Sequence, residues 1–225
     1  MNAELALPRL LQLASPALPV GAYSYSEGLE QACEAGKVND AGSLESWLLD
    51  ALHSGNARLE AALVLRAWSA WQARDLSLLR YWDAWCDATR ESEELRGQSL
   101  DMGRALARLL RDLHPTDAEL QTACTIARHF SSVFGLTAAY WEIPQHMAVE
   151  GYLHAWAGNI ISAGVKLIPL GQTAGQRLLW SLQGDIRLAA AQALDLPDEQ
   201  LASFGPGLAL ASMHHEIQYT RLFRS

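Results

Sequence analysis

Apolar residues recur along this chain with the spacing of an α-helix, and no segment shows the apolar and polar alternation that marks a β-strand. In residues 43–52 they fall at i, i+3, i+4, i+7 and i+8, behind Ser43 as a candidate N-cap. Thr116 and Glu119 have the spacing of a capping box that opens a helix toward Phe130. Further helices are expected at residues 26–35, 58–73, 75–90 and 95–113. The pattern therefore predicts an all-α protein.

Two apolar helices are expected late in the chain, at residues 149–167 and 178–193, with Pro169 and Gly171 between them. The only formal charges between Ile143 and Gly184 are those of Glu150, Lys166 and Arg177. Helices with so few charges must be covered, either by the rest of the bundle or by another subunit. We therefore expect residues 1–225 to form a single-domain bundle of about eight to ten helices, with these two as a central hairpin.

The chain contains eight tryptophans, most of them within the predicted helices. Tryptophan can anchor an interface, but in a helical segment it most often packs inside the protein. The residues expected in the core are Trp47, Trp68, Trp71, Trp82, Trp85, Trp156 and Trp180.

The composition excludes several classes of protein. Half of the residues are hydrophobic, which excludes intrinsic disorder, and a net charge of −8 argues against binding of nucleic acid or an anionic membrane through positive charge. Cys33, Cys86 and Cys124 are odd in number and far apart, as expected of buried, reduced thiols. There is no secretory signal at the N-terminus, and residues 160–170 are too short an apolar run to span a membrane. We therefore expect a cytoplasmic protein.

Motifs that would indicate catalysis or metal binding are incomplete. Residues 171–177, GQTAGQR, contain glycines but lack the lysine and hydroxyl of a phosphate-binding loop. His215 begins a zinc-protease box, but Tyr219 replaces its second histidine. A structural or interface role explains His214 and His215 better than metal binding does. The other histidines, including His129, have no cysteine or carboxylate at ligand spacing.

Three acidic residues, Glu91, Glu93 and Glu94, stand at the expected start of a helix. Their charges suit a helix N-terminus, so we interpret them as a solvated first turn rather than as an acid and base pair. The sequence thus predicts no catalytic residue and no metal site.

Four segments, taken in order, carry a resemblance to a known family. Residues 10–30 read LLQLASPALPVGAYSYSEGLE, residues 91–106 ESEELRGQSLDMGRAL, residues 159–179 NIISAGVKLIPLGQTAGQRLL and residues 211–225 ASMHHEIQYTRLFRS. In order and spacing they resemble the urease accessory protein F (UreF) family over essentially the whole chain. Lys166 departs from the arginine expected there, and residues 57–79 and 110–121 match only in helical character.

The resemblance implies an all-helical, commonly dimeric protein that joins two other accessory proteins, the D (or H) subunit and the GTP-binding G subunit. That assembly docks on apo-urease and uses GTP hydrolysis to insert nickel. The chain is then expected to act as an adaptor or chaperone, not as an enzyme. It would need no cofactor of its own, because the complex handles nickel and GTP, and its partners would include neither nucleic acid nor membrane.

The terminal segments, residues 1–25 and 208–225, are predicted to dock partners. Apolar residues beside arginines at the chain end favour binding of the D/H subunit, with docking on the chain's own bundle as the alternative. The predicted D/H-binding residues are Tyr219, Thr220, Arg221, Leu222, Phe223 and Arg224.

A second group of residues in the matched segments is assigned to a dimer or G-subunit contact: Tyr23, Tyr25, Arg96, Arg104, Lys166, Gln172 and Arg177. Packing within the bundle is the alternative for the two tyrosines. Arginines supplied in trans can accelerate a GTPase, and restraint of hydrolysis is equally compatible with the resemblance. The candidates for this effect are Arg96, Arg104, Arg177 and Arg221.

Polar residues also form two faces on the late helices. One face contains Asn159, Ser162 and Lys166, and the other contains Gln172, Gln176, Gln183 and Arg187. They suit a hydrated dimer interface or a passage for nickel, because neutral oxygen ligands bind that ion weakly. The main alternative function is a helical-bundle enzyme or ligand carrier with an apolar pocket between the late helices. It would need convergent titratable groups, and a large cavity would support it.

Overall fold

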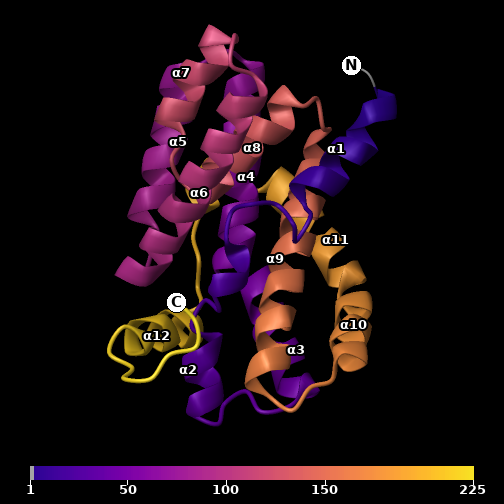
Figure 1. Cartoon of the computed structure of the whole chain (residues 1–225), viewed down its shortest axis with the longest axis vertical. Helices are drawn as coiled ribbons and strands as arrows, with labels where there is room; N and C mark the ends of the chain where they lie inside the picture. Colours follow the sequence, from indigo (N-terminus) through magenta and orange to yellow (C-terminus); the bar gives the residue numbers. More distant parts are fainter. Residues whose placement is uncertain (1–2) are drawn as a thin grey trace.

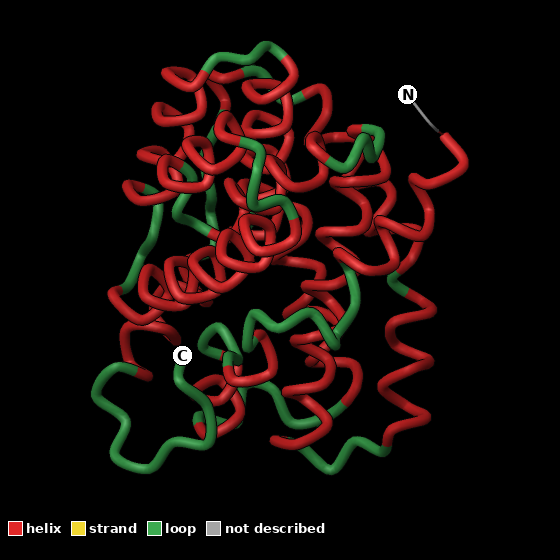
Figure 2. The backbone as a smooth tube through the Cα atoms, turned by 45° about the horizontal axis from the view of Figure 1, so that its top comes forward, coloured by secondary structure: helices red, strands yellow, loops and turns green. Residues whose placement is uncertain are grey.

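Helices make up all the regular structure of residues 3–225, the part of the chain that this computed structural model describes (Figure 1, Figure 2). Short 3-10 helices are η1 (Ala3–Leu5), η2 (Ala22–Ser24) and η3 (Asp198–Gln200). The α-helices are α1 (Ala6–Leu13), α2 (Leu29–Glu34), α3 (Ala41–His53), α4 (Asn56–Gln72), α5 (Leu76–Ala88), α6 (Glu93–Leu113), α7 (Ala118–Ile126), α8 (Phe130–Tyr140), α9 (Gln145–Leu167), α10 (Gln172–Ser181), α11 (Gln183–Asp195) and α12 (Pro206–His215). The all-α prediction is confirmed, and the helices number twelve because short ones such as α1 and α2 add to the long ones.

Side-chain caps fix where several helices begin. Asp40, not Ser43, is the N-cap of α3, and Ser43 completes the capping box from the third helical position. The predicted box at Thr116 is likewise displaced by one residue, because Asp117 accepts from the Leu120 N–H at 3.0 Å. Aspartate and serine both cap well, so the residue pattern alone could not choose between neighbouring candidates.

The centre of the bundle is the contact between α4 and α8, the most extensive between any two helices in residues 3–225. Every residue from Ser131 to Ala139 is buried. A methyl group at Gly135 would overlap the Val64 carbonyl oxygen of α4 and lie 3.0 Å from Ala67. Small residues therefore let the two backbones approach closely, and α9 and α6 pack around this pair.

The expected late hairpin is present, but the helix predicted at residues 178–193 is divided at Leu182 between the end of α10 and α11. α10 returns along α9, with Gly175 against Ile161 and Val165, and Gly158 near Leu179. α9 runs through the middle of the molecule, whereas α10 lies at its edge (Figure 1).

The two helices of this hairpin are not equally buried: α9 has many buried residues and α10 few. Only Gly175 and Leu178 of α10 are buried, and Trp180 is 74% exposed, so its assignment to the core is wrong. The reason is that α10 packs mainly against α3, α9 and α11, which leaves its outer face open. Cover of that face by another subunit stays a prediction.

The N-terminal helix α1 lies against the end of α8 and the middle of α9. Arg9 donates to the Trp141 carbonyl oxygen at 2.6 Å, and Leu10 fills the space above Gly151. Met1 and Asn2, which begin the predicted docking segment 1–25, lie outside the described residues.

The cysteines are free, with Cys86 and Cys124 buried as expected and Cys33 half-buried. Burial raises the pKa of the Cys33 and Cys124 thiols to about 11 and that of Cys86 to about 12, so all three are protonated at neutral pH. Between residues 3 and 225, no helix combines the length and apolar character needed to cross a bilayer.

A pair of substitutions in α6 tests the close approach of α6 and α8. A methyl group at Gly103 would overlap the Arg128 carbonyl oxygen, whereas one at Gly97 would meet nothing within 4 Å. Gly103→Ala should lower the free energy of unfolding by about 1–3 kcal/mol, because overlapping backbone must shift. Gly97→Ala should raise it by about 0.5–1 kcal/mol. Urea denaturation measures both, and equal effects at the two sites would contradict the observed packing.

Candidate functional site

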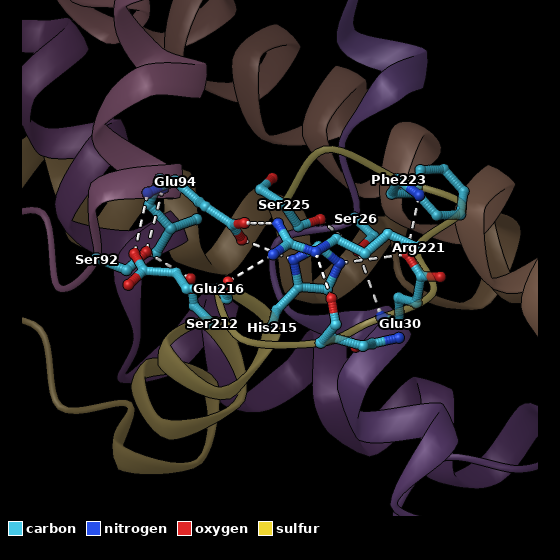
Figure 3. Close-up of polar contacts among 12 residues, drawn as sticks. Ser26, Glu30, Ser92, Glu94, Ser212, His215, Glu216, Arg221, Phe223 and Ser225 are labelled. Atoms are coloured by element: carbon cyan, nitrogen blue, oxygen red, sulfur yellow. Dashed lines mark hydrogen bonds and ion pairs between the residues drawn. The ribbon is translucent and has the colours of Figure 1, made fainter.

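Residues 216–225 fold back onto the bundle, and we call them the C-terminal strap (Figure 1, Figure 3). The N–H of Arg224 donates to the carbonyl oxygen of Ser24 at 2.9 Å. The N–H and hydroxyl of Ser26 donate to the Ser225 carbonyl oxygen at 2.8 and 2.5 Å. The strap is thus bonded through its backbone to the segment that precedes α2.

Four side chains hold the strap, and we call them the clasp: Glu30, Glu94, His215 and Arg221 (Figure 3). His215 is completely buried, with Nδ1 2.6 Å from a Glu94 oxygen and Nε2 3.3 Å from a Glu30 oxygen. Glu30 accepts from the N–H groups of strap residues 222 and 223 at 2.6 and 2.9 Å. Arg221 donates to the second oxygen of Glu94 at 2.5 Å. The clasp therefore joins α2, α6, α12 and the strap.

The end of α12 is fastened to the start of α6 as well. Glu216 accepts from the N–H groups of Glu93 and Glu94 at 2.7 and 3.2 Å, and the hydroxyls of Ser92 and Ser212 lie 2.6 Å apart (Figure 3). A carboxylate is favourable at a helix N-terminus because the first N–H groups there have no partner within the helix. These bonds therefore hold the first residue of the strap, Glu216, against the start of α6.

Near the end of the strap, Phe223 packs into the main core and is only 6% exposed. The Lys166 ammonium lies 5.3 Å from its ring centroid, within the range of a cation–π interaction. Phe223 thus packs on the chain's own bundle, which was the alternative to a partner pocket. Tyr219 and Leu222 are 103% and 64% exposed and remain open to a partner.

The strap continues an exposed apolar surface on α12. Leu210 and Met213 share one side of α12 by their spacing, and Ile217 lies in the turn that follows the helix; the three are 53%, 47% and 81% exposed. Tyr219 and Leu222 are the next large exposed apolar residues along the strap, and we call these five residues the α12 surface. Large apolar side chains that stay exposed in a protein with a buried core are candidates for contact with a partner.

Several other predicted contact residues are already engaged within the chain. Tyr25 is buried, and its carbonyl oxygen accepts from the Asn159 amide at 3.3 Å, which is the packing alternative. Arg96 makes two hydrogen bonds of 2.8 Å with Asp87.

The rest are open at the surface. Tyr23 is 71% exposed, and Arg104 lies 3.3 Å from Asp101 with its side chain 68% exposed. Gln172 and Arg177 are exposed on α10. The structure therefore does not gather the predicted dimer or partner contacts into one surface.

The structure does bring the four matched segments together at the strap. Ser26 and Glu30 come from the first segment, Glu94 from the second, Lys166 from the third and His215 from the fourth. The interpretation of Glu94 as solvated is wrong: its side chain is 14% exposed because it binds His215 and Arg221. No short-range pattern signals such a contact between residues more than 120 positions apart.

A partly enclosed cavity of about 380 Å³ lies between α6, α9, α10 and the segment after α1. Two of its charged side chains are paired with each other: Glu60 binds Arg90, and it also binds the Tyr152 hydroxyl. Burial lowers the pKa of Arg90 and raises that of Tyr152. Asn159, Ser162, Gln172 and Gln176 also line this space, so parts of both predicted polar faces meet there.

Glu27, on the same cavity wall, has the left-handed backbone conformation that L-residues rarely adopt, with φ +53°. Its carboxylate accepts from the side chains of Asn56, Gln98 and Trp156 at 3.2, 2.9 and 2.9 Å. These three bonds stabilise the unusual backbone conformation of Glu27 and give its carboxylate a structural role.

Asp87, His129 and Ser99 form a buried chain of hydrogen bonds that the sequence did not reveal. The His129 ring nitrogens lie 3.0 Å from Asp87 and 3.2 Å from the Ser99 hydroxyl, which corrects the expectation that His129 has no carboxylate partner. Burial lowers the pKa of His129. The Ser99 oxygen also accepts from Arg90 and the Phe130 N–H at 3.1 and 3.3 Å, so the chain joins α5, α6 and α8 rather than presenting a free nucleophile.

Comparisons with known proteins agree with the resemblance in the sequence. The UreF family model matches residues 38–183. Urease accessory protein UreF of Microcystis aeruginosa is 50% identical over 96% of this chain and 96% of its own length. The proteins of the same name from Alkalilimnicola ehrlichii and Thermosynechococcus vestitus are 47% and 45% identical over 100% of this chain and 98% and 100% of their own lengths.

The buried ion pair of the cavity wall can be tested by a double substitution. Glu60→Gln should lower the free energy of unfolding by about 3–5 kcal/mol, because it leaves the Arg90 charge buried without its counterion. Arg90→Met in the same chain should recover most of this loss. Denaturant titration compares the variants, and a double variant no more stable than Glu60→Gln would contradict the coupling.

Proposed function

The chain belongs to the UreF family of urease accessory proteins, and we propose that it serves urease maturation as a non-catalytic adaptor. In this proposal it bridges the D/H accessory subunit and the GTP-binding G subunit, and the assembly delivers nickel to apo-urease during GTP hydrolysis. The chain itself holds neither nickel nor GTP tightly. No group of three or more side chains that could hold a metal ion together occurs in the described part of the chain.

The α12 surface is the observation that carries the proposal. Five apolar side chains are exposed there although the same protein buries an extensive core. Their exposure is unfavourable in an isolated protein and becomes favourable when a partner covers them. Because three of them lie on the strap and the other two on the helix that leads into it, we assign this surface to the D/H subunit.

In this proposal some strap residues contact the D/H subunit, and others attach the strap to the bundle. Tyr219, Thr220, Leu222 and Arg224 are exposed and would meet the D/H subunit directly. Arg221 and Phe223 hold the strap in place, so they would support the contact from within.

The outer face of α10 supports a second contact. Gln172, Arg177 and Trp180 are exposed there, and few charges surround them. We propose that this face joins a second copy of the chain or the G subunit, with Arg104 on α6 as a further contact. Arg177 is better placed than Arg96 and Arg221 to act on the G subunit's GTPase, because the latter two are held by Asp87 and Glu94. Arg104 pairs with the exposed Asp101 at the longer distance of 3.3 Å.

The cavity is the observation that favours a different function, that of a ligand carrier or enzyme. Glu27, Glu60, Arg90 and Tyr152 converge in it, as that alternative requires. Each of them is hydrogen-bonded to a neighbouring side chain, and only the Arg90 Nε is buried without a hydrogen-bond partner, so a ligand would have to compete with most of these bonds. A passage for nickel past the neutral oxygens of this cavity stays a prediction.

Substitution of exposed strap residues tests the D/H assignment without disturbing the fold. Tyr219→Ala with Leu222→Ala should weaken capture of the purified D/H subunit by about tenfold or more, because both side chains are open to a partner. Tyr81→Ala is the matched control: it removes a 53% exposed tyrosine from α5. Capture by surface-immobilised D/H subunit measures the effect, and equal affinities for all variants would exclude this surface.

Arg177→Ala tests the α10 face in the complete accessory complex. We expect weaker retention of the G subunit and slower single-turnover GTP hydrolysis, because an exposed guanidinium can reach a neighbouring phosphate site. Arg80→Ala on α5 is the control for loss of an exposed positive charge. Unchanged retention and hydrolysis in Arg177→Ala would remove this residue from the proposal.

A further inference from the structure

The cavity beside α6, α9 and α10 is large enough to hold a small organic molecule. Its volume of about 380 Å³ falls within the usual range of ligand pockets, about 300–1,000 Å³. A cavity of about 150 Å³ already accommodates benzene. We propose that this cavity is a binding site for an uncharged, mainly apolar molecule with one polar end, up to about twice the size of benzene.

Apolar side chains from three helices and the segment after α1 form much of the cavity wall. Each of the larger ones is less than 10% exposed, so together they make a wall that water solvates poorly. An apolar molecule that enters displaces water from this wall, which is favourable in free energy. These side chains are Leu18 and Val20 of the segment after α1, Leu95 and Met102 of α6, Phe134 of α8 and Ile161 of α9.

The charged groups of the wall leave no free counterion for a charged ligand. Arg90 is the only arginine or lysine among the described residues that line the cavity, and it pairs with Glu60. The Glu27 carboxylate accepts three side-chain hydrogen bonds. An anion or a cation would therefore lose hydration in a partly enclosed apolar space without gaining an ion pair, which is unfavourable. The apolar body of an uncharged ligand needs none of these groups and leaves their bonds intact.

Neutral polar side chains lie where the cavity meets solvent. Ser162 of α9 and Gln172 and Gln176 of α10 line the cavity and are exposed, and Asn159 is half-buried. Hydroxyls and amides can both donate and accept hydrogen bonds, so they suit a hydroxyl or carbonyl group of a ligand. The polar end of the ligand therefore belongs at this opening and its apolar body inside. Such a ligand is compatible with the adaptor role, and its binding is tested on this chain alone.

Titration of the full-length protein with 1-octanol tests the site. The readout is the NMR signal of methionines labelled with 13C at the methyl group. The signal of Met102, which lines the cavity, should shift with a Kd on the order of 0.1 mM or lower, as expected of a ligand this small. Met213 on the exposed α12 surface reports binding to exposed apolar residues in general, and it should not shift. No change at Met102, or an equal change at Met213, would overturn the proposal.

A series of related probes tests the chemical class of the ligand. Octanoate and octylammonium have the same number of carbons as 1-octanol, but at neutral pH one is an anion and the other a cation. Each should bind at least about tenfold more weakly than 1-octanol, because neither finds a free counterion. 1-Hexanol should bind about 15-fold more weakly, since each buried methylene contributes about fourfold in affinity. An ion that binds as tightly as 1-octanol, or a hexanol that does, would contradict the assignment.

Two glycine substitutions supply a matched pair of variants. Gly158 lines the cavity, and a methyl group there would meet only Leu179, at 4.0 Å, so Gly158→Leu has room to fill part of the space. Gly184→Leu makes the same change on α11, outside the cavity and with nothing within 4 Å. We expect Gly158→Leu to weaken binding of 1-octanol about tenfold or more and Gly184→Leu to leave it unchanged. Equal binding by both variants would exclude the cavity. If Gly158→Leu does not fold, the methionine shifts and the probe series in the wild-type protein decide.

Discussion

The close approach of α4 and α8 is the constraint on which the remaining helices depend. Gly135 sits directly against the backbone of α4, and no larger residue could take its place without separating the helices. A second contact without side chains, at Gly103, brings α6 against the start of α8. α8 packs between α4 and α6, and α9 packs beside α4 and α8. α10 packs against α9 in turn, and Lys166 of α9 contacts Phe223 of the strap.

Polar groups inside this bundle contribute to the specificity of the fold. The Glu60 and Arg90 pair, the three bonds to Glu27 and the His129 chain each join side chains from different helices. Buried polar groups are costly when they lose their partners, so these bonds favour one arrangement of the helices over alternatives with similar apolar burial. The proposed adaptor role would require a defined scaffold of this kind.

The C-terminal strap has one side that packs on the bundle and one side that is exposed to solvent. Its inner side belongs to the fold, because Phe223 and its backbone N–H groups are bound by α2 and the core. Its outer side, with Tyr219 and Leu222, belongs to the surface. The largely buried carboxylates of Glu30 and Glu94 hold the inner side, so the same bonds that fix the strap to the bundle also fix the position of its exposed residues.

The sequence by itself determined the helical class, the late hairpin and the family, because periodic apolar positions, the Pro169 and Gly171 break and ordered motifs are local properties of the chain. It assigned Trp180 to the core and Glu94 to solvent, and both assignments were wrong. Whether a helix face is covered, or a first-turn carboxylate meets a histidine more than 120 residues away, depends on which elements lie beside it. Only the tertiary structure decides that, because side-chain burial and ion pairing arise from contacts between distant segments, and local periodicity contains no information about them.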